Sequence, residues 1–137
     1  MERRPPTPVS KTFQFCRQIF QDTATQEYLL LGPTHQAIVP EFPAFVDLSL
    51  YARWTSVQGT YRLELQLQDL EGEVVWAAPE GAPLEGRDPL LVCVITLRHN
   101  QVFFPSPGKY DMVMLANGDE VIRDVFWAHL GRPISPE

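Results

Sequence analysis

The chain has 137 residues, which suits a single domain, and its 45% hydrophobic and 20% charged residues are typical of a soluble protein. The formal net charge of -6, with no basic stripe to offset it, argues against a nucleic-acid-binding surface. No apolar run approaches the ~20 residues of a membrane helix and no export-signal pattern opens the sequence, so we expect a cytoplasmic protein without a membrane partner.

The two ends of the chain differ in composition from the segment between them. Residues 1–11 are rich in arginine and then in proline, which predicts a disordered arm, and residues 131–137 predict a flexible tail. Residues 12–130 are expected to form one β-sandwich domain.

Alternating apolar and polar residues dominate the first half of that domain. The pattern predicts strands over "TFQFCRQIF" (12–20), "YLLLG" (28–32), "HQAIVP" (35–40) and "FVDLSLYARW" (45–54). Residues 22–28 could form a loop or a short helix, and both readings stay open.

The second half continues the same period. "GTYRLELQLQDLEGEVV" (59–75) predicts a hairpin, and the nearly all-apolar "PLLVCVITLRH" (89–99) predicts a strand that is covered on both faces or meets a partner. In "PGKYDMVMLANGDEV" (107–121), Asn117-Gly118 suits a type I′ turn between two strands. Residues 121–130 are read as the returning strand rather than a helix.

Two segments of the chain echo each other, because each contains Gly-x-Tyr, an alternating run and a Gly turn. Tyr61 and Tyr110 occupy the equivalent positions. Either residue could form the tyrosine corner of immunoglobulin-like sandwiches, and Tyr110 is the better candidate because Pro107 and Gly108 precede it. The alternative is that both are ordinary cross-strand aromatics.

The spacing of the strands defines the fold class. About eight strands without βαβ alternation predict an all-β fold, a two-sheet antiparallel β-sandwich of the immunoglobulin-like type. A single, partly closed barrel is the structural alternative.

Reactive groups in the sequence show no motif of catalysis or metal binding. His35, His99 and His129 are isolated, and Cys16 and Cys93 lie in apolar strand patterns that predict buried free thiols. We therefore expect no catalytic residue, no metal and no cofactor, and no enzyme. A cluster of His99, His129 or Cys93 with carboxylates would favour an enzyme instead.

Two aromatic pairs point to a surface for a partner. In Phe103-Phe104 and Phe126-Trp127, adjacent strand residues must face opposite sides, so at least one member of each pair leaves the core. This predicts a non-enzymatic protein–protein interaction or structural module, with a protein partner or a second copy of the chain on the final hairpin face. A sandwich that binds a carbohydrate or another small molecule is the alternative. The predicted interface residues are Phe103, Phe104, Val121, Val125, Phe126 and Trp127.

The order of the segments resembles a family of small bacterial proteins of unknown function. The likeness rests on "FCRQIFQDTATQEYLLLG", "QAIVPEFPAFVDLSLYARWT", "GTYRLELQLQDLEGEVV" and "PGKYDMVMLANGDEV", and it covers roughly residues 13 to 130. The resemblance implies a cytoplasmic β-sandwich and no activity, cofactor or catalytic residue. The proline-rich N-terminal arm is not part of the shared layout.

Overall fold

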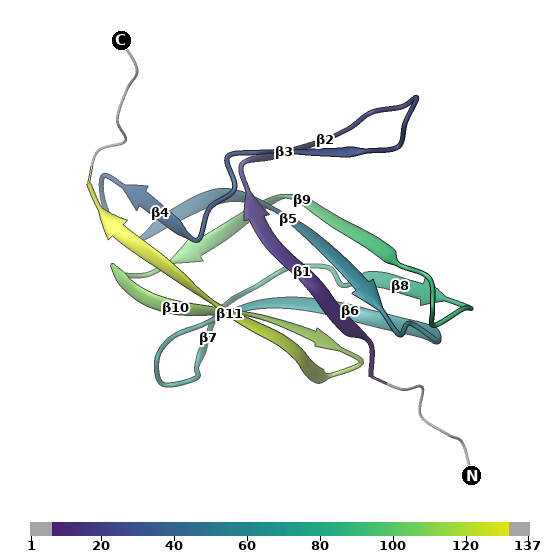
Figure 1. Ribbon diagram of the computed structural model, residues 1–137. Coiled ribbons are helices and arrows are strands. Elements are labelled where there is room, and N and C mark those ends of the chain that lie inside the picture. The colour runs from purple at the N-terminus through teal and green to yellow at the C-terminus, as the bar shows by residue number, and fades with distance from the viewer. Residues whose placement is uncertain (1–6, 132–137) are drawn as a thin grey trace.

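Residues 7–131 of the chain are described by the computed structural model, and they fold into two packed β-sheets (Figure 1). The smaller sheet has three antiparallel strands in the order β1-β5-β9. Its strands are β1 (Val9–Cys16), β5 (Ala44–Thr55) and β9 (Cys93–Phe104).

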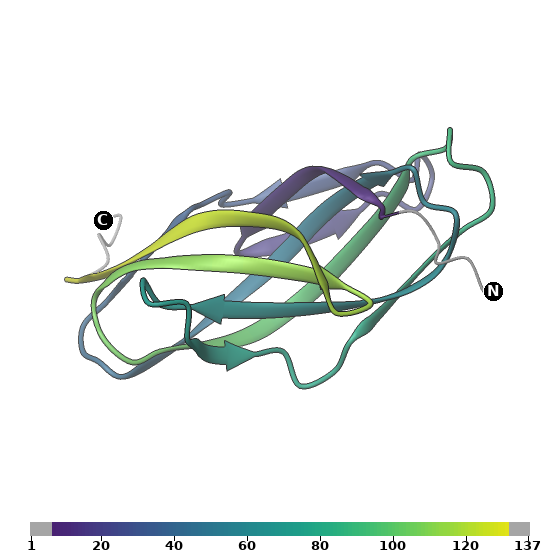
Figure 2. The same cartoon turned by 90° about the horizontal axis from the view of Figure 1, so that it is seen from below.

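The larger sheet lies opposite, with the order β4-β11-β10-β6-β7, and β8 also pairs with β6 (Figure 2). The pair β4-β11 is parallel, a departure from the purely antiparallel sandwich that the sequence predicts. The strands of this sheet are β4 (Gln36–Val39), β6 (Gly59–Gln68), β7 (Val74–Ala77), β8 (Ala82–Gly86), β10 (Gly108–Ala116) and β11 (Asp119–Leu130).

This topology is that of an immunoglobulin-like sandwich, as the strand spacing predicts. β1, β5 and β9 take the places of strands A, B and E, and β11, β10 and β6 take those of G, F and C. The structure has more strands than the eight expected, because residues 17–39 and 69–86 divide into short pieces.

The alternating runs place their apolar residues between the sheets, as predicted. On β5 the inward series from Leu48 to Trp54 is buried, and on β6 so is the series from Tyr61 to Leu67. On β10, which pairs with β6, Met112 and Met114 are buried in the same core. This shared core determines how the strands are paired, since a shift by one residue would expose each whole series.

An inserted hairpin interrupts the first predicted strand. The run expected over 12–20 ends at Cys16 and resumes as β2 (Gln18–Gln21), which pairs with β3 (Tyr28–Leu31). Residues 22–28 form a turn rather than a helix. The Asp22 carboxylate accepts the Ala24 and Thr25 N–H groups at 2.8 and 3.0 Å, and these bonds hold the pKa of Asp22 below its usual value.

The two ends of the chain lie largely outside the described residues. Residues 1–6 and 132–137, which fall within the predicted arm and tail, lie outside the described residues. Val9 pairs with Thr55, so β1 begins three residues before the predicted domain start at residue 12.

The Asn-Gly turn is of the predicted kind. Asn117 and Gly118 have φ values of 51° and 86°, the positive pair that a type I′ turn requires. Asn117 also joins the hairpin to β6, because its Oδ1 accepts the Arg62 N–H at 2.9 Å.

Both echoing tyrosines bond to upstream backbone. The Tyr110 hydroxyl donates to the Ser106 carbonyl at 2.5 Å and accepts the Ser106 N–H at 3.2 Å. The Tyr61 hydroxyl donates to the Gln58 carbonyl at 3.0 Å. Tyr110, at the start of the strand equivalent to F, therefore forms the tyrosine corner.

We expect Tyr110→Phe to lower the free energy of unfolding by about 0.5–1.5 kcal/mol, because the hydroxyl loses its part-buried hydrogen bonds to the Ser106 backbone. Urea denaturation would measure the change. Tyr61→Phe is the comparison, because the Tyr61 hydroxyl also donates to upstream backbone. A Tyr110→Phe protein as stable as the native chain would contradict a stabilising role of the Tyr110 corner.

Candidate functional site

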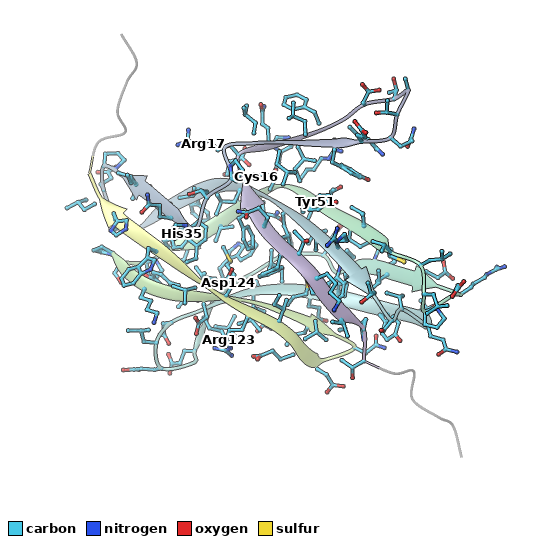
Figure 3. All side chains as sticks on the ribbon, in the orientation of Figure 1. Cys16, Arg17, His35, Tyr51, Arg123 and Asp124 are labelled. Atoms are coloured by element: carbon cyan, nitrogen blue, oxygen red, sulfur yellow. The ribbon has the colours of Figure 1, made fainter. Side chains whose placement is uncertain are left out.

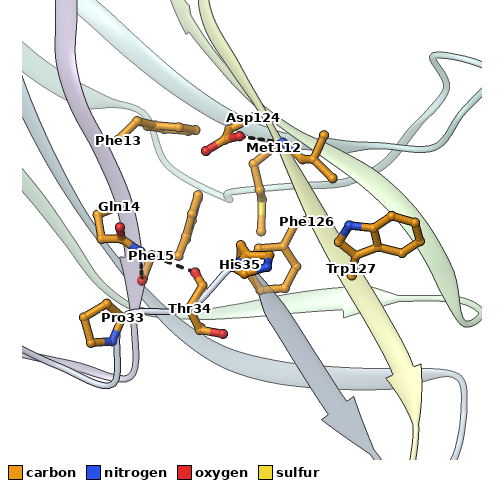
Figure 4. Close-up of a pocket in the computed structure, with 11 residues that line it drawn as sticks. Phe13, Gln14, Phe15, Pro33, Thr34, His35, Met112, Asp124, Phe126 and Trp127 are labelled. Carbon is orange, nitrogen blue, oxygen red and sulfur yellow. Dashed lines mark hydrogen bonds between the residues drawn. The ribbon is translucent and has the colours of Figure 1, made fainter.

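A groove separates the first and last strands of the sandwich, where the two sheets meet without pairing. It has a volume of about 430 Å³, within the ~300–1,000 Å³ range of ligand sites. We call it the seam groove (Figure 4). Its lining residues are Phe13, Gln14, Phe15, Pro33, Thr34, His35, Met112, Asp124, Val125, Phe126 and Trp127.

Aromatic rings form the inner wall of the seam groove. Phe13 meets Phe15 edge-on with ring centroids 5.2 Å apart, and Phe15 meets Phe126 edge-on at 5.9 Å. Phe15 and Phe126 are buried in the core, and Phe13 packs against it. The groove therefore has an apolar floor that is continuous with the core.

The segment 33–35 closes one end of the seam groove. The Thr34 N–H donates to the Phe15 carbonyl at 2.9 Å, and the Trp127 N–H donates to the His35 carbonyl at 2.9 Å. This segment thus bonds to β1 on one side and to β11 on the other, just before β4 begins its parallel pairing with β11.

Beyond that closed end, both walls of the seam groove are strand edges. Among the described residues, β1 has a ladder only with β5, and residues 119–126 of β11 have one only with β10. Backbone groups two residues apart on a strand point the same way. The N–H of Val125 therefore points outward, on the same edge as that of Trp127.

Side chains bond to outward backbone groups on both walls. On β11 the Asp124 carboxylate accepts the Val125 N–H at 2.9 Å. On β1 the Gln14 side-chain amide donates at 2.8 Å to the Phe15 carbonyl, which also accepts the Thr34 N–H at the closed end. Figure 4 shows both side chains at the groove. The edge of β11 is therefore covered at Val125 by a rotatable side chain, which an incoming strand could displace.

Two of the predicted interface residues lie in the core instead. Phe104 and Phe126 are 0% and 1% exposed, and their rings stack with centroids 5.6 Å apart. Each belongs to the inward-facing side of its strand, so both rings are part of the core. Phe126 also lines the seam groove.

Of the remaining predicted residues, Phe103 and Trp127 lie on different sheets, and Val121 packs against the core. Phe103 packs on Phe45 of the smaller sheet, with ring centroids 5.1 Å apart. Trp127, 39% exposed, stacks on His129 of the larger sheet. Val121 and Val125 are half-buried on β11. The six predicted residues do not form one surface, but Val125, Phe126 and Trp127 all line the seam groove.

Several residues of the site and of the surface escaped the sequence analysis. Nothing in the local sequence marks Asp124 or Gln14, because no local pattern shows that their strands meet. Phe20, Leu29 and Leu31 form an exposed apolar face on the β2–β3 hairpin, with Leu29 64% exposed. The uninterrupted run "YLLL" was the available signal for that face.

A second hollow lies at the base of the hairpin and contains a histidine beside a carboxylate. His99 Nδ1 is 3.4 Å from Asp47 Oδ2, and the His99 N–H donates to the buried Ser49 hydroxyl at 3.0 Å. Both members of the pair are at least half exposed. Arg17 also lines this hollow (Figure 3). The histidine–carboxylate pair is one element of the cluster named above as favouring an enzyme.

The cysteines and histidines are otherwise spread over the fold. Burial raises the pKa of the Cys16 thiol, which lowers its reactivity, and Cys93 lies on a different strand. Within residues 7–131, no three histidine, cysteine or acidic side chains group as a metal site would require. The described part of the chain likewise holds no helix with the length and apolar character to span a membrane.

The tryptophans also lie apart. Trp54 is buried on β5, Trp76 lies on β7 and Trp127 lies on β11. Their placement does not build the shared concave aromatic surface that a carbohydrate site would use.

Comparison with known proteins found one matching family and a similar solved structure. Residues 11–125 match the profile of a family of unknown function (DUF6941). No curated protein matches the chain. The crystal structure of an immunoglobulin-like protein from Pseudomonas aeruginosa is similar, with a TM-score of 0.44 and 10% sequence identity. The match covers 91% of this chain and 98% of that chain.

Proposed function

The chain belongs to the DUF6941 family of unknown function. We propose that it is a non-enzymatic protein-binding module whose site is the seam groove. The bound segment is an extended stretch of another protein, which pairs with the outward edge of β11. Binding by strand addition uses main-chain hydrogen bonds for affinity and side-chain contacts for specificity.

The observation that supports the proposal is the strand edge on each side of one groove with an aromatic floor. Residues 120–126 of β11 and Phe13 of β1 have no second strand partner among residues 7–131. Sheet edges are templates for another chain unless something covers them. On β11 the cover at Val125 is a single side chain, that of Asp124.

Strand addition at the seam groove gives affinity for the bound segment without a large exposed apolar patch. An incoming strand replaces the bond from Val125 to the Asp124 carboxylate with main-chain bonds, and it places alternate side chains over Phe13. The cost of ordering the site is small, because the β10–β11 ladder already holds the edge in extended form.

Val125→Pro tests this function at the backbone level. The Val125 N–H bonds to a side chain and not to β10, so proline removes no ladder bond but blocks strand addition. The probes are peptides of twelve residues, selected from a random phage-displayed library on the full chain. We expect the variant to bind them at least tenfold more weakly in fluorescence anisotropy.

Two controls make the result specific. Phe45→Ala changes an exposed ring on the other sheet and should leave peptide affinity unchanged. Methylating alternate backbone nitrogens of the peptide should abolish binding to the native chain, which separates strand addition from a lost fold in the proline variant. Selection of no peptide, or equal affinity of methylated and unmethylated peptides, would contradict the proposal.

A further inference from the structure

Among residues 7–131, Asp124 is the one acidic side chain that lines the seam groove. It lies opposite Met112, a buried residue, and therefore on the inward-facing side of β11. Figure 3 shows it between β1 and β11. Its carboxylate accepts the Val125 N–H, and the described residues bring no cation to it.

Arg123, the neighbouring cation, bonds to other side chains on the opposite face of the strand. Arg123 donates to Glu120 at 2.6 Å, to Asp111 at 2.9 Å and to Gln68 at 3.0 Å. These bonds lower the pKa of Glu120 and raise that of Arg123. Because consecutive strand residues point to opposite faces, Arg123 and Asp124 do not neutralise each other.

An inward-pointing charge on an edge strand controls what can pair with that edge. A strand that covers Asp124 with apolar or acidic side chains removes water from a carboxylate without replacing its partners, which is unfavourable. A strand that places a lysine or arginine there supplies a charge-assisted hydrogen bond instead. The carboxylate therefore distinguishes between candidate partners.

We propose that Asp124 selects, as the partner of the seam groove, an extended segment that carries a basic residue opposite it. This inference rests on the proposed function and names the chemistry of the partner. The net charge of -6 supports it, because an acidic protein attracts basic segments over distance. A second copy of β11 fits poorly, since it would bring another Asp124 to the same edge.

The test uses the peptides selected on the native chain. We expect them to share a lysine or arginine at a fixed position between apolar residues. Replacing that residue with glutamine should weaken binding to the native chain about tenfold or more, as for close charge pairs at interfaces. The same replacement should change affinity by less than twofold on Asp124→Asn, whose amide oxygen can still accept the Val125 N–H.

Glu80→Gln is the matched control, because it removes the same charge from an exposed residue in the β7–β8 connection. On this variant the lysine-to-glutamine loss should stay about tenfold. A loss that also stays tenfold on Asp124→Asn would overturn the inference. Peptides without a basic preference that still fail to bind Val125→Pro would overturn it too and leave the proposed function standing.

Two further results distinguish a basic partner from other possible occupants of the seam groove. Peptides that bind Val125→Pro as tightly as the native chain would overturn the proposed function and, with it, this inference. Light scattering of the protein alone should show no dimer that Val125→Pro dissociates. Such a dimer would identify a second copy as the occupant and overturn the assignment of a basic partner.

Discussion

Phe126→Ala is expected to lower the free energy of unfolding by about 3–5 kcal/mol, the usual cost of removing a buried phenylalanine ring. The Phe126 ring is 1% exposed and contacts both Phe104 and Phe15, so truncation leaves a cavity where the two sheets meet. Chemical denaturation, followed by circular dichroism, would measure the loss.

Phe45→Ala makes the same chemical change on the surface and serves as the control. The Phe45 ring is 66% exposed, so its removal should cost about 1 kcal/mol or less. A Phe126→Ala protein of native stability, with a changed oligomeric state, would instead support the original reading of Phe126 as a contact residue. Equal losses at both positions would contradict the burial on which the core assignment rests.

The face that β6 turns to the core could be predicted from the sequence because burial along this strand follows a period of two. The series from Tyr61 to Leu67 needs no tertiary information, since one face of the strand is apolar and the other polar. The Asn117-Gly118 turn was equally local, because its positive φ values depend on two adjacent residues. Local patterns of this kind determine strands and turns, and through them the fold class.

The short strands and the inserted hairpin could not be predicted in the same way. "TFQFCRQIF" predicts a single strand, yet the chain leaves the smaller sheet after Cys16 and joins the larger sheet as β4. The parallel pairing of β4 with β11 joins segments about ninety residues apart. No period in the sequence encodes such a long-range choice.

Only part of the candidate site could be predicted from the sequence, because the site also depends on long-range strand placement. The rule that neighbouring strand residues face opposite sides correctly separated Phe126 from Trp127, but it could not say which of the two was inside. Asp124 acquires its importance from β1, a strand more than one hundred residues earlier in the chain. The groove exists only because the two edges meet.

Leu65→Ala is expected to lower the free energy of unfolding by about 2–5 kcal/mol. Leu65 is 1% exposed on β6 and lies opposite Met114 of β10, so its side chain fills the centre of the layer between the sheets. Urea denaturation, monitored by tryptophan fluorescence, would report the change, because Trp54 is buried in the same core cluster.

Leu70→Ala is the matched control five residues along the chain. Leu70 is 71% exposed in the turn after β6, and its truncation should change stability by no more than about 0.5 kcal/mol. The contrast tests the period-of-two argument directly, since both leucines belong to the same apolar-rich run. If the two substitutions cost the same, Leu65 does not lie between the sheets, and the register of β6 against β10 is wrong. A large difference instead supports the strand pairing that also places Met112 and Asp124 opposite each other at the seam groove.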